Sequence, residues 1–199
     1  MPVRSLFATP FYDNRIGDTA LLAELEASCR MLAQEDRAGR AWSKAKGYRG
    51  YTSYASLDDL PLRDPAFADL KRLLDREARA FARAAHFDMG RAPRLDSLWV
   101  NVMKPGATHS GHIHPHSIIS GTFYVRVPPG SGALKLEDPR LPMLMASPLR
   151  TEVAPPEVQP FYYAEPEAGT VFLWESWLRH EVMANAAKSE RISISFNYR

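Results

Sequence analysis

The chain has 199 residues, of which 45% are hydrophobic and 24% charged, with a formal net charge of +2. This composition is typical of one soluble globular domain and excludes an intrinsically disordered chain. The longest apolar runs are far shorter than the roughly 20 residues of a membrane-spanning helix, so no membrane segment is expected. Residues 1–93 hold 15 Lys/Arg and 13 Asp/Glu and residues 94–199 hold 10 of each, so neither half predicts nucleic-acid binding.

The sequence also indicates a compartment. Cys29 is the only cysteine, so no disulfide can form within the chain, which suits a reducing environment. The opening residues MPVRSLFATPFY lack the apolar stretch and small-residue cleavage site of a signal peptide. We therefore expect a cytoplasmic protein, and the sequence leaves a homo-oligomer open.

Two amphipathic helices are predicted in the first half of the chain. One follows Asp18, a suitable N-cap, and has apolar residues at helical spacing over Leu21–Leu32. The other begins at Asp64-Pro65, a cap followed by proline at the first helical position. Residues 40–63 between them read as irregular, with strand-like pieces around Tyr48–Tyr54.

From Leu95 onward the pattern changes to short β-type runs broken by Gly and Pro. The predicted strands are Leu95–Met103, His112–His114, Ile118–Val127, Ala133–Glu137, Phe161–Ala164, Thr170–Trp174, His180–Met183 and Arg191–Arg199. Eight short strands after two helices predict a β-sandwich or jelly roll with helices packed on one sheet. Residues 139–166 hold seven prolines in 28 positions and predict a long loop, which would act as a lid over the site or form a rigid surface loop.

The last predicted strand has two distinct faces. Its apolar side chains alternate with polar ones, in the order Arg191, Ile192, Ser193, Ile194, Ser195, Phe196, Asn197 and Tyr198. The predicted helices need an apolar surface on which to bury their own apolar faces, so we expect the polar face to point into the sandwich. A polar interior is favourable only where it binds something polar.

A cluster of histidines predicts a metal site. His112 and His114 lie two apart on one predicted strand, so their side chains share a face. His180, 66 residues after His114, is the candidate third ligand of a facial set that leaves open positions for reactants. An isolated His-x-His is a weak signal, and His109 and His116 are near enough to compete.

These histidines, followed by Arg-x-Ser on the last strand, resemble the iron(II)- and 2-oxoglutarate-dependent oxygenases. The segments WVNVMKPGATHSGHIHPHSIISGTFYV, GSGALKLEDPR and GTVFLWESWLRHEVMANAAKSERISISFNYR are similar to a bacterial and phage branch of that superfamily, as is the opening LFATPFY. The resemblance implies a single domain over residues 1–199. Residues 94–199 would form a double-stranded β-helix, a form of jelly roll, and residues 1–93 a helical buttress.

The resemblance also implies the metal ligands. His112 and His180 match the two iron-binding histidines, and His114 matches a third position that is usually Asp or Glu. An imidazole there leaves the site one positive charge higher and weakens its selectivity for iron over zinc, copper or nickel. Glu137 or Asp138 could supply the missing carboxylate, although a structural charge pair at a strand end is the simpler interpretation of these residues.

The same resemblance implies a cosubstrate site. Arg191 matches the arginine that pairs with the distal carboxylate of 2-oxoglutarate, and Ser193 matches the hydroxyl beside it. Tyr124 and Asn101 are the further implied contacts, and no catalytic residue is implied beyond the metal ligands. The implied activity is that of an iron(II) dioxygenase that consumes O2 and 2-oxoglutarate, releases succinate and CO2, and hydroxylates a substrate that the sequence does not identify.

Other functions remain open at this stage. A three-histidine cupin-like metalloprotein would not use 2-oxoglutarate; it would be a cosubstrate-free dioxygenase or a metal-dependent binding module. Three histidines with an open fourth position also describe a zinc-hydroxide site. The Arg-x-Ser pair speaks against these alternatives. A jelly-roll scaffold with incidental histidines is a third interpretation, and Trp99, Trp174 and Trp177 read as ordinary buried core.

Overall fold

The structure is a computed structural model that describes residues 3, 5–16 and 18–199. The helices are α1 (Thr19–Glu35), α2 (Arg37–Ala45), α3 (Leu60–Arg63) and α4 (Pro65–Ala84), with 3-10 turns η1 (Leu141–Met143) and η2 (Pro156–Val158). The strands are β1 (Phe11–Arg15), β2 (Gly50–Thr52), β3 (Leu95–Met103), β4 (His109–His112), β5 (Ile119–Arg126), β6 (Leu134–Glu137), β7 (Phe161–Ala164), β8 (Thr170–Glu175), β9 (His180–Val182) and β10 (Arg191–Tyr198).

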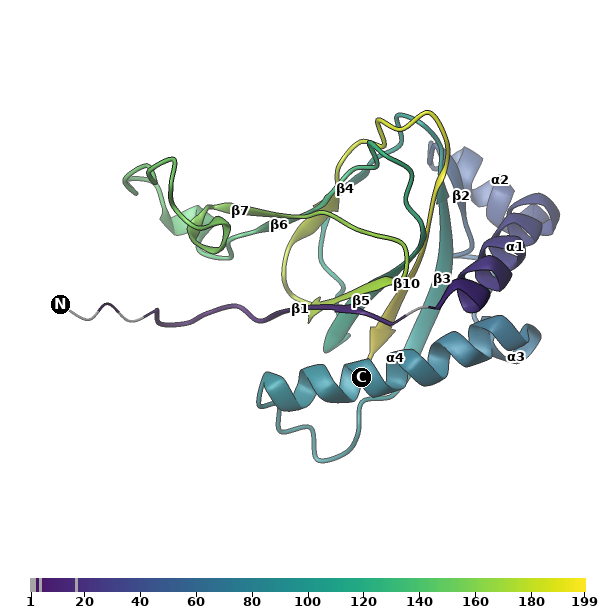
Figure 1. Cartoon of the computed structure of the whole chain (residues 1–199), viewed down its shortest axis with the longest axis horizontal. Coiled ribbons are helices and arrows are strands. Elements are labelled where there is room, and N and C mark those ends of the chain that lie inside the picture. The colour runs from purple at the N-terminus through teal and green to yellow at the C-terminus, as the bar shows by residue number, and fades with distance from the viewer. Residues whose placement is uncertain (1–2, 4, 17) are drawn as a thin grey trace.

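The strands form two antiparallel sheets, a larger one in the order β1-β8-β5-β10-β3-β2 and a smaller one in the order β4-β9-β6-β7 (Figure 1). From β3 onward the chain passes back and forth between the sheets, with β3, β5, β8 and β10 in the larger and β4, β6, β7 and β9 in the smaller. This winding is that of a double-stranded β-helix, so the predicted fold is confirmed. The N-terminal 93 residues add the edge strands β1 and β2 to the larger sheet.

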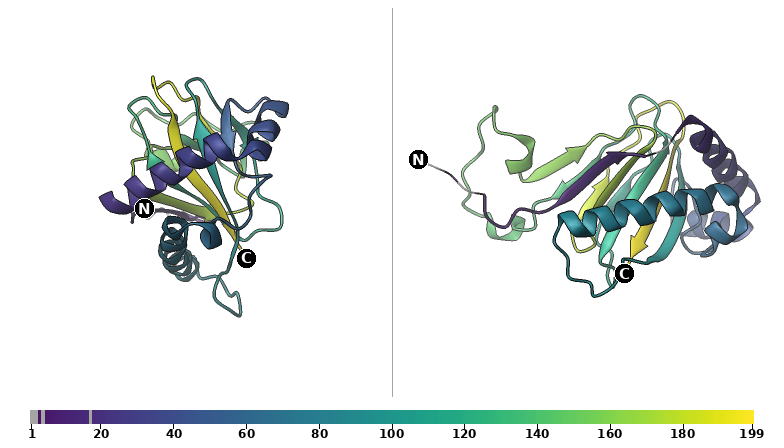
Figure 2. Two further views of the ribbon diagram at one scale, coloured as in Figure 1. Left: turned by 90° about the vertical axis from the view of Figure 1, so that its right-hand side faces the viewer. Right: turned by 60° about the horizontal axis from the view of Figure 1, so that its bottom comes forward.

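The two long helices begin where their capping residues predict. The Asp18 carboxylate accepts from the backbone N–H of Leu21 at 2.8 Å, and the Asp64 carboxylate accepts from that of Ala66 at 2.8 Å. Both helices lie on the same side of the larger sheet (Figure 2) and bury their apolar faces in one core with it. The helices therefore cover one face of this sheet and leave the other face toward the smaller sheet.

Strand β10 divides its residues between these two faces as its sequence predicts. Ile192, Ile194, Phe196 and Tyr198 are fully buried in the core shared with the helices. The polar residues Arg191, Ser193 and Ser195 line a pocket between the sheets instead. The tyrosine ends this apolar row with a hydrogen bond of 2.8 Å to Asp75 on α4, which ties the helix to the strand.

Two local predictions are wrong. Helix α2 occupies part of the segment predicted as irregular; Asp36 ends α1 and caps α2 by accepting from the N–H of Gly39 at 2.9 Å, so no linker separates the two helices. Strand β4 ends at His112 instead of His114. Pro115 has no N–H with which to continue the ladder, and the N–H of His114 turns to the carbonyl of Ser176 at 2.9 Å.

Residues 138–160, between β6 and β7, form an arm that extends away from the two sheets (Figure 1). Its most exposed apolar side chains are Met143, Met145, Leu149 and Val153, which are 74%, 94%, 98% and 91% exposed to solvent. None of its residues lines the pocket beside Arg191. The lid predicted for residues 139–166 is therefore not formed in this arrangement.

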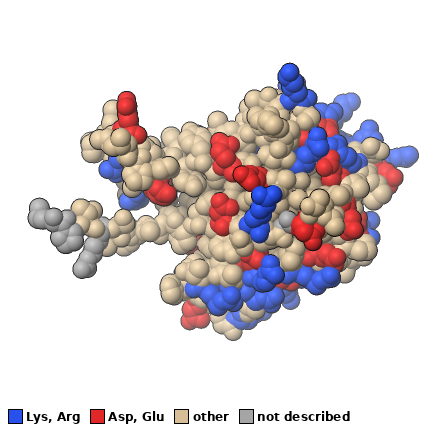
Figure 3. Space-filling model, in the orientation of Figure 1, with Lys and Arg blue, Asp and Glu red and all other residues tan. Residues whose placement is uncertain are grey.

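Basic and acidic side chains are interspersed over much of the visible surface (Figure 3). A row of basic residues follows the lower edge, where α4 lies in Figure 1. Lys71 on this helix pairs with Asp75 at 2.6 Å, and Arg72 pairs with Asp69. No helix in the described part of the chain is long and apolar enough to cross a membrane.

Candidate metal centre and adjoining pocket

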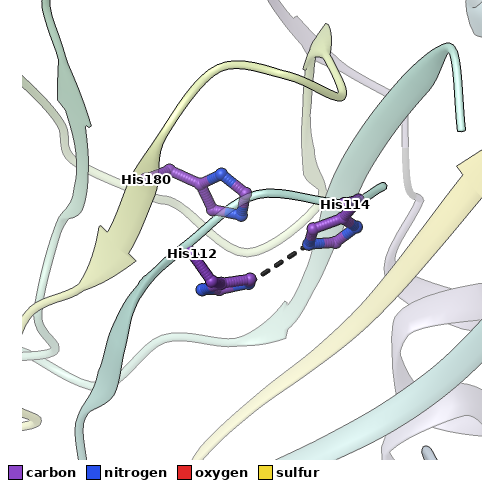
Figure 4. Close-up of side chains that lie close together, drawn as sticks. All are labelled: His112, His114 and His180. Carbon is purple, nitrogen blue, oxygen red and sulfur yellow. Dashed lines mark hydrogen bonds between the residues drawn. The ribbon is translucent and has the colours of Figure 1, made fainter. Parts of the chain in front are cut away.

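Three histidines converge beside strands β4 and β9 of the smaller sheet. His112 on β4 and His180 on β9 are directly opposite each other in the strand register, and His114 follows two residues after the end of β4. One nitrogen of each ring lies within 4.8 Å of the other two, and Figure 4 shows the rings facing a common space. The structure therefore brings together all three predicted ligands, although they do not all lie on strands.

Each ring is held through its Nδ1 atom by an oxygen acceptor. The contacts are His112 to the carbonyl of Ser110 at 2.7 Å, His180 to the carbonyl of Leu178 at 2.9 Å, and His114 to Oδ1 of Asn197 at 2.6 Å. A nitrogen that contacts a carbonyl or amide oxygen must carry the proton. In a neutral ring this leaves Nε2 with a lone pair, which is the form in which histidine binds a metal.

The Nε2 atoms of His112 and His114 are 3.1 Å apart (Figure 4). With both protons on Nδ1, neither Nε2 atom can donate to the other, so their lone pairs repel. A cation between them turns this repulsion into attraction. Two nitrogens that bind one metal at 2.0–2.1 Å and at a right angle lie about 3 Å apart, which matches the observed spacing.

Burial keeps these imidazoles neutral. It lowers the pKa of His180 to about 3, with help from the nearby His112, and it lowers the pKa of His112 and His114 as well. A neutral imidazole is a ready ligand, because a metal does not have to displace a proton from it. At neutral pH the three imidazoles can therefore bind a metal cation without first losing a proton.

His114 depends on a small polar network. The Oδ1 atom of Asn197, which accepts from its ring, also accepts from the hydroxyl of Ser120 at 2.8 Å, and the Nδ2 atom of Asn197 donates to Ser97 at 3.0 Å. These two bonds fix which end of the amide faces the histidine. The sequence placed Asn197 on the polar face of its strand but gave it no partner.

Two buried tryptophans contact the cluster. The ring centroid of Trp99 lies 5.9 Å from that of His114, and the ring centroid of Trp174 lies 4.6 Å from that of His180. Both were read from the sequence as ordinary core. They form part of the apolar surroundings of the histidines, whereas Trp177, which was also read as core, is 46% exposed.

The carboxylates considered as alternative ligands are engaged elsewhere. Glu137 pairs with Arg179 at 3.3 Å, and Asp138 pairs with Arg140 at 2.8 Å. Neither joins the histidine cluster among the described residues. The ring of His109 stacks on that of His112 at 4.4 Å without joining the cluster, and His116 is exposed in the following turn.

A pocket lies between the sheets beside the cluster. All four residues predicted to contact a cosubstrate line it: Asn101, Tyr124, Arg191 and Ser193. Asn101, Ser193 and Tyr124 are neighbours in the register of β3, β10 and β5, so they form one row across the floor of the pocket. His109 lines the pocket as well and connects it to the histidine cluster.

Arg191 is the one charged side chain of Lys, Arg, Asp or Glu in this pocket lining, and only 2% of its surface is exposed. Its Nη1 atom donates to the carbonyl of Gly132 at 2.8 Å, and its Nη2 atom contacts the sulfur of Met103 at 3.1 Å. Its Nε atom has no partner, and no carboxylate of the described residues pairs with the guanidinium. A buried cation with a free donor indicates that the pocket receives an anion.

Comparison with known proteins identifies the family. Residues 97–197, about half of the chain, match the family described as "Putative 2OG-Fe(II) oxygenase". The chain belongs to this family. The matched residues run from β3 to β10, so they contain all three clustered histidines and Arg191.

Solved structures of oxygenases share the fold. The epimerase SnoN from nogalamycin biosynthesis, in complex with Fe3+, alpha ketoglutarate and nogalamycin RO, is similar with a TM-score of 0.67 and 18% identity over 96% of this chain and 78% of SnoN. A prolyl-4-hydroxylase from Pseudomonas putida is similar with a TM-score of 0.59 and 16% identity over 96% of this chain and 92% of the hydroxylase. An oxidoreductase of the 2OG-Fe(II) oxygenase family from Burkholderia pseudomallei matches 67% of this chain with 18% identity and a TM-score of 0.49. The chain spans 57% of the length of that oxidoreductase. No curated protein matches the chain.

Tyr48 is a pocket residue that the sequence analysis did not assign to the site. Tyr48, which lies between α2 and β2, lines the pocket together with Arg191. It precedes the part of the chain that matches the oxygenase family. Nothing in its local sequence distinguishes it from the other tyrosines, because its role depends on where the N-terminal segment meets the sandwich.

Proposed function

We propose that this oxygenase binds one divalent metal ion, iron(II), through the Nε2 atoms of His112, His114 and His180. The donor set supports this assignment, because all three Nδ1 atoms are engaged and two of the Nε2 atoms are 3.1 Å apart. When bound, the iron supplies the oxidative chemistry of the family, in which O2 and 2-oxoglutarate are consumed and succinate and CO2 are released as a substrate C–H is hydroxylated.

The adjoining pocket would hold 2-oxoglutarate. The single observation that carries this part of the proposal is the buried Arg191 guanidinium, whose Nε donor is free and which has no carboxylate partner in the described residues. A planar guanidinium matches a carboxylate with two parallel hydrogen bonds. Arg191 would bind the distal carboxylate, while Ser193, Tyr124 and Asn101 orient the chain of the cosubstrate toward the histidines.

The third histidine has an electrostatic consequence for this site. Three neutral imidazoles leave the full charge of a divalent cation in place, whereas a carboxylate ligand would cancel part of it. A dianionic cosubstrate is attracted more strongly to the more positive site. The replacement of the usual carboxylate by His114 therefore favours retention of 2-oxoglutarate, while it makes the site more tolerant of metals other than iron.

The cupin-like alternative without 2-oxoglutarate does not account for Arg191. A site that only activates water or O2 has no need for a buried cation in its neighbouring pocket, and a buried cation without a partner is costly. In the proposed function, the distal carboxylate of 2-oxoglutarate neutralises the charge of Arg191.

Titration calorimetry under anaerobic conditions tests the proposal. Wild type should bind one Mn(II) per chain, and the loaded protein should bind one 2-oxoglutarate. His180→Ala should lose both, whereas His116→Asn, in an exposed turn at φ 71° that asparagine tolerates, should keep both. Full metal occupancy in His180→Ala would contradict the ligand set, and a loaded wild type that ignores 2-oxoglutarate would favour the cupin-like alternative.

A further inference from the structure

Tyr48 reaches the pocket from outside the double-stranded β-helix. It lies between α2 and β2 in the N-terminal segment and lines the same pocket as Arg191. Its ring meets the ring of His109 edge-on at a centroid distance of 6.2 Å. The phenol therefore lies beside both the guanidinium that would bind the cosubstrate and the histidine that stacks on the metal cluster.

The local sequence KGYRG holds Tyr48 in this place. Gly47 adopts φ +66°, a left-handed conformation that turns the chain back after α2, and the N–H of Tyr48 bonds to the carbonyl of Ser43 at 2.8 Å. Gly50 begins β2 so close to β3 that a Cβ atom there would lie 2.0 Å from the carbonyl oxygen of Val102. These two glycines fix the tyrosine against the strand that carries Met103, the contact of Arg191.

Two donors of the pocket are buried without a partner among the described residues. One is the hydroxyl of Tyr48 and the other is Nε of Arg191. Buried donors in native proteins are nearly always satisfied, so two free donors in one pocket point to a shared ligand. Burial also raises the pKa of Tyr48, so its hydroxyl keeps its proton and can donate.

We propose that Tyr48 is a further cosubstrate-binding residue, whose hydroxyl donates to the distal carboxylate that Arg191 binds. This inference rests on the proposed function, because it assumes 2-oxoglutarate in this pocket. The hydroxyl would make the pocket selective for 2-oxo acids with a second carboxylate. It also makes the N-terminal segment part of the binding site, since Tyr48 precedes the part of the chain that matches the family.

Calorimetry with two ligands tests the role of Tyr48. On Mn(II)-loaded protein, Tyr48→Phe should weaken the binding of 2-oxoglutarate about 10-fold to 100-fold, since a hydrogen bond to a charged group is lost. The binding of 2-oxopentanoate, which has a methyl group in place of the distal carboxylate, should not change. Tyr54→Phe is the matched control, because this tyrosine is 61% exposed and does not line the pocket; it should bind both ligands as wild type does.

Three outcomes overturn the inference. Equal 2-oxoglutarate affinity in wild type and Tyr48→Phe would show that the hydroxyl makes no bond to the ligand. An equal loss for 2-oxoglutarate and 2-oxopentanoate would show that the tyrosine only supports the shape of the pocket. A wild type that binds metal but no 2-oxoglutarate would overturn the proposed function and this inference together, so the two failures are distinguishable.

Discussion

Replacement of Arg191 by methionine should weaken the binding of 2-oxoglutarate without lowering the free energy of unfolding. Methionine fills a similar volume with an apolar chain, so the change removes the charge without opening a large cavity. The carbonyl of Gly132, which accepts from Arg191 at 2.8 Å, loses its donor, at a cost of about 1–3 kcal/mol. The change also removes a cation that is 98% buried without a carboxylate partner, whose desolvation costs several kcal/mol.

The balance predicts that the metal-free Arg191→Met variant unfolds with a free energy at least equal to that of wild type. Its affinity for 2-oxoglutarate should fall by about 30-fold to several thousand-fold, because truncating one partner of a buried charge pair costs about 2–5 kcal/mol. Arg191→Lys keeps the charge but cannot form the forked pair. Its affinity for 2-oxoglutarate should therefore lie between that of wild type and that of Arg191→Met.

Urea denaturation of the metal-free proteins and calorimetry of the Mn(II)-loaded proteins measure the two quantities. Metal binding should be unchanged in both variants, because Arg191 is not one of the clustered histidines. A loss of more than about 3 kcal/mol of unfolding free energy, together with unchanged 2-oxoglutarate affinity, would refute the reasoning. The arginine would then be a structural residue that satisfies Gly132.

Three further predictions concern other parts of the molecule. His109→Ala should keep one metal ion per chain, as measured by metal analysis, because this ring stacks on His112 without joining the cluster; loss of the metal would make it a ligand. Asn197→Ala should weaken Mn(II) binding about 10-fold to 100-fold in calorimetry, since the ring of His114 loses its acceptor; unchanged affinity would contradict this role. Burial raises the pKa of Glu77, but hydrogen bonds from Asn14 and Tyr12 and the charge of Arg76 outweigh this effect and lower it overall. The stabilisation by the ionised carboxylate is present above its unfolded pKa and is lost as pH falls through the folded one. Glu77→Gln should therefore cost about 1–3 kcal/mol of unfolding free energy at neutral pH, and this cost should shrink as pH falls from the unfolded pKa through the folded one; a cost independent of pH would contradict this account.

The sequence predicted best where one pattern had one structural solution. The alternation along β10 determined both of its faces, because a strand packed under helices must turn its polar side chains the other way. The caps Asp18 and Asp64 located the starts of the two long helices. The clustering of His112, His114 and His180 was predicted from an incorrect local geometry, since His114 reaches the cluster from a loop held by Ser176 and not from the strand of His112.

The parts that were missed depend on distant contacts. Only Asp36 separates helix α2 from α1, and Gly39 lowers the helical propensity of α2, so the sequence resembles a loop. Strand β1 pairs with β8, which lies more than 150 residues later, and its five residues carry little pattern of their own. Tyr48 is distinguished only by the pocket that the folded chain builds around its hydroxyl.

The acceptors that hold the Nδ1 atoms of the three histidines differ in whether a substitution can remove them. His112 and His180 each bond to the main-chain carbonyl two residues before them, in Ser110 and Leu178. Every amino acid supplies that carbonyl, so substitutions at these two positions leave the acceptors in place. His114 instead relies on the side chain of Asn197. Side-chain substitutions can therefore leave the acceptors of two rings intact, whereas the acceptor of the third ring depends on a single amide near the C-terminal end of the chain.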